Sequence, residues 1–240
     1  MKTLNLNEIK GNIHMGNQKV YKGICYNCGN EYAKRGMTRH LKSCRDLQKQ
    51  QEQSGEKDYL LMRVQGKYNK RYFLYLDIKE KTTMDDFDQF LRDIWLECCG
   101  HLSGFYINGQ NYTFYPFMHE RAKNNPKNKI KNVLENDTKY EYKYDFGTTT
   151  GLEVEIISKR SGQDREHLIE VVARNILSDI ECDECGAKAK WFCQSYDCFP
   201  YYYCDDCVEE NKGEFGAVPF INTPRLGACG YPSGAEENRI

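Results

Sequence analysis

The chain has 240 residues, of which 40% are hydrophobic and 29% charged, a composition that excludes wholesale disorder and collagen-like or low-complexity architectures. No apolar run approaches the roughly 18 residues that a membrane span needs, and the first residues are too polar for a signal peptide. We therefore expect a cytoplasmic protein that contacts no membrane. The 12 cysteines are many for a reducing compartment, and their spacing favours zinc over disulfides.

The net charge of −1 is distributed unevenly along the chain. Residues 1–57 carry 11 basic against 5 acidic side chains, residues 58–178 carry 18 against 18, and residues 179–240 carry 5 against 12. Only the first part has the sign that favours nucleic acid. This division predicts a zinc finger over 20–47, a linker over 48–57, an α+β domain over 58–178 and a cysteine-rich zinc module over 179–240.

The first metal motif is Cys25-x2-Cys28-x11-His40-x3-Cys44. Zinc takes four nitrogen or sulfur ligands, and here a knuckle of CxxC type supplies two while one helix face supplies the others at i and i+4. Tyr32 and Met37 stand where a ββα finger keeps its small apolar core. The stretch therefore resembles a zinc finger of the Cys-Cys-His-Cys type.

Four basic residues lie at or beyond the start of the finger helix, where such a helix meets the major groove of DNA: Lys34, Arg35, Arg39 and Lys42. They are the predicted nucleic-acid-binding residues. A single finger covers only about 3 base pairs, too few for sequence-specific binding. The alternative is a solvated basic face or a surface that docks a protein.

The central domain opens with two strand-like runs, Tyr59–Val64 and Arg71–Ile78. A helix follows, with Thr83 as its N-cap and Gly100 as its end. Its apolar stripe is Phe87, Phe90, Leu91, Ile94, Trp95 and Cys98. Such a stripe is typical of a helix that covers one face of a sheet.

Further strands are expected beyond this helix. Asn108-Gly109 between two aromatic runs predicts a hairpin, and residues 119–129 form a charged loop before a short amphipathic turn or helix with Ile130. Apolar residues alternate over 140–146 and again over 152–156, which predicts an antiparallel pair. Residues 168–174 are expected to form one more strand, with a helix as the alternative for so short a run. The predicted fold class is α+β, with a mixed or antiparallel sheet and one long helix.

The last part of the chain holds two more CxxC knuckles, spaced as in a zinc ribbon, with the ligands Cys182, Cys185, Cys204 and Cys207. Such an all-cysteine site is coordinatively closed, hence structural. Three further cysteines offer a second tail site: Cys193, Cys198 and Cys229. Its fourth ligand would be water or a carboxylate of Asp197, Asp205 or Asp206, and the alternative is that these are buried or free thiols. The sequence thus predicts two zinc ions, or three if this group binds metal.

Cys98 and Cys99 with His101 have the form of half a metal site, but the place of Cys98 on the helix stripe favours a core thiol. The chain has no catalytic motif of the hydrolase, P-loop, zincin or dinucleotide-binding type. His101 and His119 flank the hairpin and, with Asp145, are the one grouping that has a catalytic composition; surface histidines are the simpler interpretation. We therefore predict a protein that is not an enzyme and has no small-molecule substrate.

Three segments of the central domain carry a resemblance: CGHLSGFYINGQNY, KYEYKYDFGTTTGLEVEI and VVARN before the cysteine cluster. Together they resemble the plasmid ORF-three-like family, also labelled insertion-element passenger TnpR, over about residues 58–178. The later FINTPRLGACGY is similar to the cysteine-rich extension of one branch of that family. The resemblance implies an α+β domain associated with mobile elements. The label is borrowed from serine resolvases, whose catalytic signature the sequence lacks.

The predicted function is therefore that of a non-enzymatic zinc-binding protein, associated with mobile elements, that contacts nucleic acid through the basic finger and engages a protein partner. The alternative is a protein-interaction adaptor in which all zinc is structural.

Overall fold

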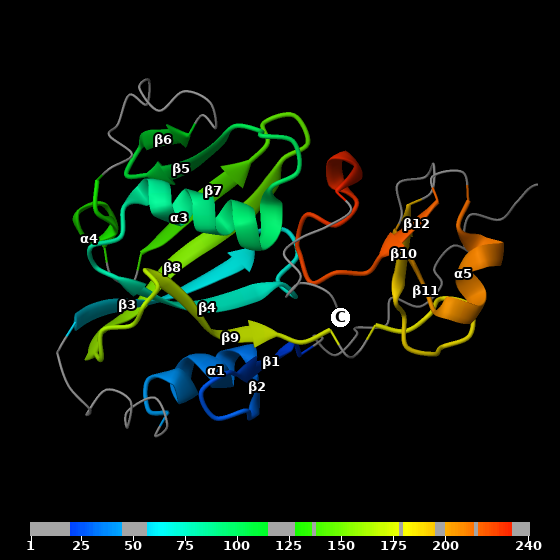
Figure 1. Cartoon of the computed structure of the whole chain (residues 1–240), viewed down its shortest axis with the longest axis horizontal. Helices are drawn as coiled ribbons and strands as arrows, with labels where there is room; N and C mark the ends of the chain where they lie inside the picture. The colour runs from blue at the N-terminus through cyan, green and yellow to red at the C-terminus, as the bar shows by residue number, and fades with distance from the viewer. Residues whose placement is uncertain are drawn as a thin grey trace, which may run out of the picture.

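The computed structural model of the chain describes residues 20–44, 57–114, 128–135, 138–177, 180–194, 200–213 and 216–231. The described strands of its main sheet are β1 (Lys22–Cys25), β2 (Glu31–Ala33), β3 (Lys57–Gly66), β4 (Phe73–Lys79), β5 (Ser103–Ile107), β6 (Gln110–Phe114), β7 (Lys139–Tyr144), β8 (Thr150–Gly162) and β9 (Ile169–Asn175). They lie in the order β2-β1-β9-β4-β3-β8-β7-β5-β6, and every pairing is antiparallel (Figure 1).

The tail forms a small sheet of β10 (Trp191–Gln194), β11 (Pro200–Tyr203) and β12 (Ala217–Pro219). The described helical segments are α1 (Lys34–Leu41), α3 (Met84–Leu91), the π-helical turn η1 (Arg92–Leu96), α4 (Ile130–Val133), α5 (Asp205–Asn211) and the short 3-10 turn η2 (Ala228–Gly230). The predicted α+β class is confirmed, with its main helix and a cysteine-rich group near each end of the chain. No described helix has the length and apolar character to cross a membrane.

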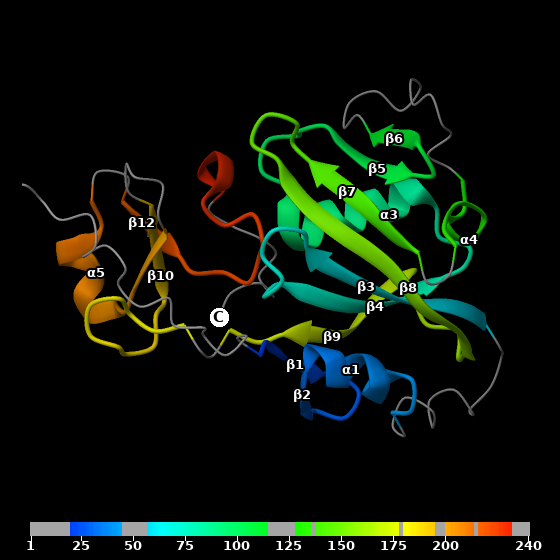
Figure 2. The same ribbon diagram turned by 180° about the vertical axis from the view of Figure 1, so that it is seen from behind.

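Both faces of the main sheet are covered at β4, where every residue is buried. Leu74 and Leu76 belong to the large core that includes Phe87 and Leu91 of α3. Phe73 and Tyr75, which alternate with these leucines, belong to a second core, shared with α1 of the predicted finger. Figures 1 and 2 show α3 and α1 on different sides of the strands.

The predicted finger is continuous with the central sheet. β1 pairs with β9, so that Cys25 lies opposite Ala173, and β2 forms the sheet edge beyond it. Met37 and Leu41 of α1 are almost fully buried against Phe73. Since a lone small finger buries little apolar surface, this contact gives the helix most of its hydrophobic support. The predicted linker lies outside the described residues, except for Lys57 at the start of β3.

The main helix begins as predicted and ends earlier. The Thr83 side chain accepts a hydrogen bond from the Asp86 N–H, and the Asp86 carboxylate accepts one from the Thr83 N–H, so the capping box is complete. The helical segment ends at Leu96 after the π turn, not at Gly100. Cys98 therefore lies beyond the helix stripe on which the sequence placed it, in the turn that leads to β5.

The hairpin at Asn108-Gly109 is confirmed, with φ of 49° and 76° at these two residues, as a two-residue turn of this type requires. The short helix at Ile130, the antiparallel pair β7 and β8 and the strand over 168–174 are also present. Phe146 is an exception to the predicted alternation. The backbone leaves the extended conformation at Asp145, where φ is 62°, and Phe146 is 44% exposed. Most of the predicted charged loop lies outside the described residues.

Candidate metal centres

Three groups of four side chains have the composition and proximity of metal ligands among the described residues. In each group the four ligand atoms all lie within 4.8 Å of one another. We call Cys25, Cys28, His40 and Cys44 the finger group, and Cys182, Cys185, Cys204 and Cys207 the tail group. The junction group consists of Cys98, Cys99, His101 and Cys229. Each group has the donors needed to hold one metal ion.

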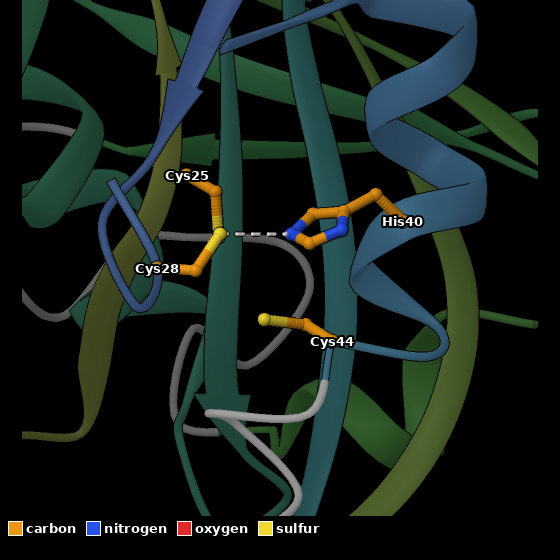
Figure 3. A group of neighbouring side chains, drawn as sticks. All are labelled: Cys25, Cys28, His40 and Cys44. Carbon is orange, nitrogen blue, oxygen red and sulfur yellow. Dashed lines mark hydrogen bonds between the residues drawn. The ribbon is translucent and has the colours of Figure 1, made fainter. Parts of the chain in front are cut away.

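The finger group is assembled by a tight turn and a helix. The N–H of Gly29, whose φ is 71°, donates to the carbonyl of Cys25 and closes the knuckle that carries Cys28. Helix α1 supplies His40, and a turn closed by the Ser43 N–H on the His40 carbonyl leads to Cys44. Figure 3 shows the four side chains converging from these two segments.

The spacing within the finger group fits a tetrahedral ion. The Cys28 Sγ lies 3.4 Å from the His40 Nε2, and ligand atoms around a tetrahedral zinc ion are expected about 3.3–3.8 Å apart, given its bond lengths of about 2.0–2.3 Å. The Tyr32 ring stacks on His40 with centroids 4.1 Å apart, which fixes the orientation of the imidazole. Burial raises the pKa of the Cys25 thiol to about 11, so metal binding at neutral pH must release its proton.

The four predicted nucleic-acid-binding residues do not share one environment. The Lys34 ammonium donates to the Gln65 side chain and to the Lys70 carbonyl, each at 3.1 Å, so it is held against the sheet. Burial, followed by nearby positive charges, lowers its pKa. Arg35, Arg39 and Lys42 are exposed. The basic surface of α1 therefore has three outward cations, and the fourth predicted one is engaged in packing.

The tail group is built from two knuckles. The Gly186 N–H, at φ 75°, donates to the Cys182 carbonyl and closes the first. Cys204 is the N-cap of α5, which places Cys207 in the first helical turn. The Cys185 and Cys204 sulfurs lie 3.6 Å apart. This distance again fits two ligands of one tetrahedral ion.

The electrostatics of the tail group favour one thiolate before any metal binds. Burial opposes the charged form of Cys182, but the backbone N–H groups of Cys185 and Cys204 outweigh it and lower the Cys182 pKa to about 6. The pKa of Cys207 is raised, first by its contact with the neighbouring Cys204 sulfur. A bound cation would offset the repulsion between neighbouring thiolates, so that all four sulfurs could act as deprotonated ligands.

The structure places two cysteines of the predicted second tail site in different surroundings. Cys193 is buried in a small cluster with Cys182 and Tyr203, whereas Cys229 lies in the junction group with side chains of the central domain. Cys198 lies outside the described residues, as does Asp197. Asp205, one of the suggested fourth ligands, instead pairs with Lys190 and accepts a hydrogen bond of 2.9 Å from the Trp191 indole.

Cys98 packs against the core, as the sequence predicts, and it also has a second environment. Its side chain packs against the main core, but its sulfur also belongs to the junction group. The predicted meeting of His101 with Asp145 is present, with 3.6 Å between Nε2 and a carboxylate oxygen, while His119 lies outside the described residues. Sequence spacing could not find Cys229 as the fourth member, since 128 residues separate it from His101.

Comparison with known proteins places no functional constraint on these sites. No protein-family model matches the chain, and no curated protein matches it in sequence. One similar solved structure is that of a protein of unknown function, MM3350 from Methanosarcina mazei Go1. The two are 17% identical with a TM-score of 0.40, over 50% of this chain and 70% of that one.

Proposed function

We propose that the chain is a non-enzymatic zinc-binding protein in which the finger group and the tail group each hold one structural zinc ion. The observation that carries this proposal is the convergence of four thiolate or imidazole donors in each group, within 4.8 Å. Soft sulfur and imidazole ligands select zinc over magnesium or calcium. Four protein ligands leave no open position for a substrate, which supports a structural role.

The two ions would stabilise different parts of the fold. In the finger group, zinc would join the knuckle after β1 to the end of α1, and α1 covers Phe73 and Tyr75 of the main sheet. In the tail group, it would join the segment before β10 to α5, next to a small apolar cluster that includes Tyr203 and Val208. The first ion would support the central sheet, and the second would support a peripheral one.

The purified chain is expected to carry at least two zinc ions in native mass spectrometry. His40→Ala should remove the finger ion and Cys185→Ser the tail ion, because each change deletes one of four ligands. Cys193→Ala is the matched control, since this cysteine belongs to none of the three groups, and it should leave the zinc count unchanged. A folded wild-type chain with one zinc ion or none would contradict the proposal.

A second function, contact with nucleic acid, is favoured by one observation: Arg35, Arg39 and Lys42 are exposed on and just after α1. We include this contact in the proposal as weak and independent of sequence, because three cations can bind only a few phosphates. The protein-interaction adaptor is the alternative if no nucleic acid binds. The association with mobile elements and the cytoplasmic location expected from the sequence stay predictions.

Nucleic-acid binding by this surface has a defined salt dependence. With three phosphate contacts, the slope of log K against log salt should be about −2.7 for duplex DNA, from about 0.9 per phosphate. Arg35→Ala with Arg39→Ala should flatten the slope by nearly two units without loss of zinc. Lys131→Ala with Lys159→Ala, which removes two cations paired with Glu80 elsewhere, is the control. An unchanged slope in the arginine variant would place nucleic-acid binding outside α1. If the wild type binds no nucleic acid at low salt, the protein-interaction adaptor is the remaining alternative.

A further inference from the structure

The junction group lies where two distant parts of the chain meet. Cys98, Cys99 and His101 occupy the turn between η1 and β5, and Gly100, at φ 69°, lets the chain reverse within it. Cys229 comes from the C-terminal segment beyond β12, at η2. The His101 Nε2 lies 3.4 Å from the Cys229 sulfur, the same separation as that between imidazole and thiol in the finger group.

The segment that brings Cys229 to this place is firmly anchored. Arg225 is fully buried, and its guanidinium donates to the Thr148 carbonyl, the Thr150 hydroxyl, the Asp145 carboxylate and the Cys98 sulfur. The Thr223 hydroxyl donates to the Trp95 carbonyl at 2.6 Å. Buried polar groups with this many partners hold one backbone path. These hydrogen bonds thus hold Cys229 close to His101.

The backbone at Cys229 is in the left-handed region, with φ of 52° and ψ of 32°. A residue with a Cβ rarely adopts this conformation, and where it persists the surrounding structure compensates for its strain. Here the conformation directs a thiol toward two other thiols and an imidazole. Four ligands bound to one ion would provide that compensation.

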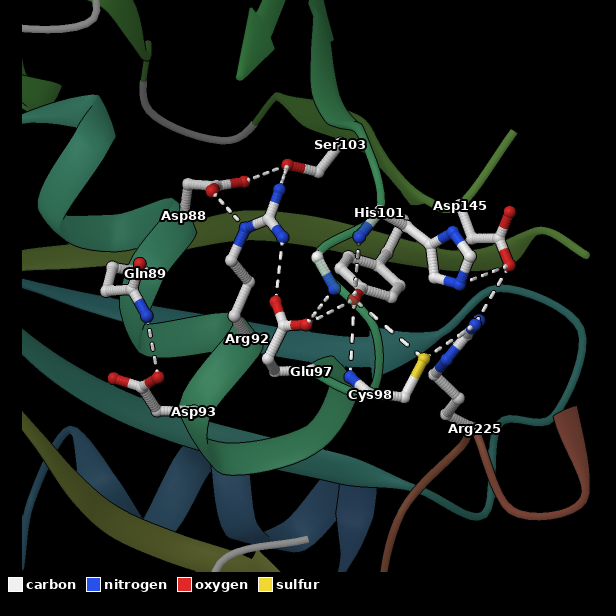
Figure 4. Close-up of polar contacts among 12 residues, drawn as sticks. Asp88, Gln89, Arg92, Asp93, Glu97, Cys98, His101, Ser103, Asp145 and Arg225 are labelled. Carbon is white, nitrogen blue, oxygen red and sulfur yellow. Dashed lines mark hydrogen bonds and ion pairs between the residues drawn. The ribbon is translucent and has the colours of Figure 1, made fainter. Parts of the chain in front are cut away.

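The surroundings also suit thiolates in place of thiols. The Arg225 guanidinium lies 3.3 Å from the Cys98 sulfur and 2.9 Å from an Asp145 carboxylate oxygen, and Figure 4 shows it between the two. Three thiolates and a neutral imidazole around a divalent zinc ion carry a net charge of about −1. An N–H donor from a buried cation stabilises such a site.

A core role explains only one of the three thiols. Cys98 is half-buried, but Cys99 and Cys229 are exposed, and exposed thiols gain nothing from packing. We propose that Cys98, Cys99, His101 and Cys229 bind a third zinc ion, which fastens the C-terminal segment to the turn between η1 and β5. Its four protein ligands make it a closed, structural site. This ion goes beyond the finger and tail zinc ions and does not depend on them.

The test is native mass spectrometry of the full chain after incubation with a small excess of zinc and desalting. The wild type should carry three zinc ions, and His101→Ala and Cys229→Ser should each carry one fewer. Both substituted side chains are at least partly exposed, so these variants are expected to fold. Cys193→Ala should keep all three, which separates this assignment from the sequence-based grouping of Cys193 with Cys229.

Each contrary result is informative. A folded wild type with two zinc ions, both retained in Cys229→Ser, would overturn the third site and leave the proposed function intact. A zinc ion lost in Cys193→Ala and kept in His101→Ala would overturn it in favour of the tail grouping. A non-reduced intact mass showing a disulfide among these cysteines would also overturn it. Only a wild type with fewer than two ions would contradict the proposed function itself.

Discussion

Replacing Cys204 by alanine is expected to unfold the three-stranded tail sheet while the nine-stranded sheet stays folded. On one side of the tail sheet lies a small apolar cluster whose five buried members among the described residues include three cysteines: Cys182, Cys193, Tyr203, Cys204 and Val208. Structural zinc contributes about 10–16 kcal/mol of apparent binding energy in small zinc peptides, as much as the stability of a whole domain. Limited proteolysis read by mass spectrometry should show new cleavage within 181–213.

Two comparison variants make this prediction specific. Cys193→Ala removes a buried cysteine from the same cluster but no metal ligand, so it should leave the tail far more protected. Cys28→Ala should instead weaken the main sheet, because the finger helix covers Phe73 and Tyr75. Equal resistance of the tail and the central sheet in Cys204→Ala would show that the tail does not depend on its metal group.

Asp88→Ala is expected to lower the free energy of unfolding by about 3–5 kcal/mol, the usual result of removing one partner of a buried ion pair. Asp88 accepts hydrogen bonds from the Arg92 guanidinium at 2.7 Å and from Ser103 (Figure 4). It also accepts one from the Tyr142 hydroxyl at 2.8 Å. The Arg92 side chain is only 3% exposed, so without Asp88 it would retain a buried charge. Glu97 would remain its one carboxylate partner among the described residues.

Asp93→Ala provides the matched control on the same helical segment. Asp93 is exposed, and its carboxylate accepts a hydrogen bond of 2.7 Å from the Gln89 side-chain amide, one helical turn away. Its loss should change stability by at most about 0.5 kcal/mol. Denaturant unfolding of both variants, with zinc present throughout, measures the difference. Similar midpoints for Asp88→Ala and Asp93→Ala would show that the buried network adds little to the stability of the sheet.

The finger and tail groups could be predicted from the sequence because their ligands are set by local geometry. A knuckle of CxxC type places two sulfurs on one turn, and His40 with Cys44 lies on one side of a helix end, so spacing alone carries the information. The capping box at Thr83 and the turn at Asn108-Gly109 were equally readable, since each depends on a few neighbouring residues.

The α+β class, most strands, the start of the main helix and eight candidate metal ligands could thus be predicted from the residues alone. The folded arrangement was needed to show that β1 pairs with β9, that the Lys34 side chain bonds to the sheet, and that Cys229 lies next to His101. The spacing of hydrophobic residues shows which side of a helix or strand is apolar, but it does not show which other element packs against that side. Contacts across 128 residues depend on the burial of whole segments such as the one anchored by Arg225, and no local spacing encodes that arrangement.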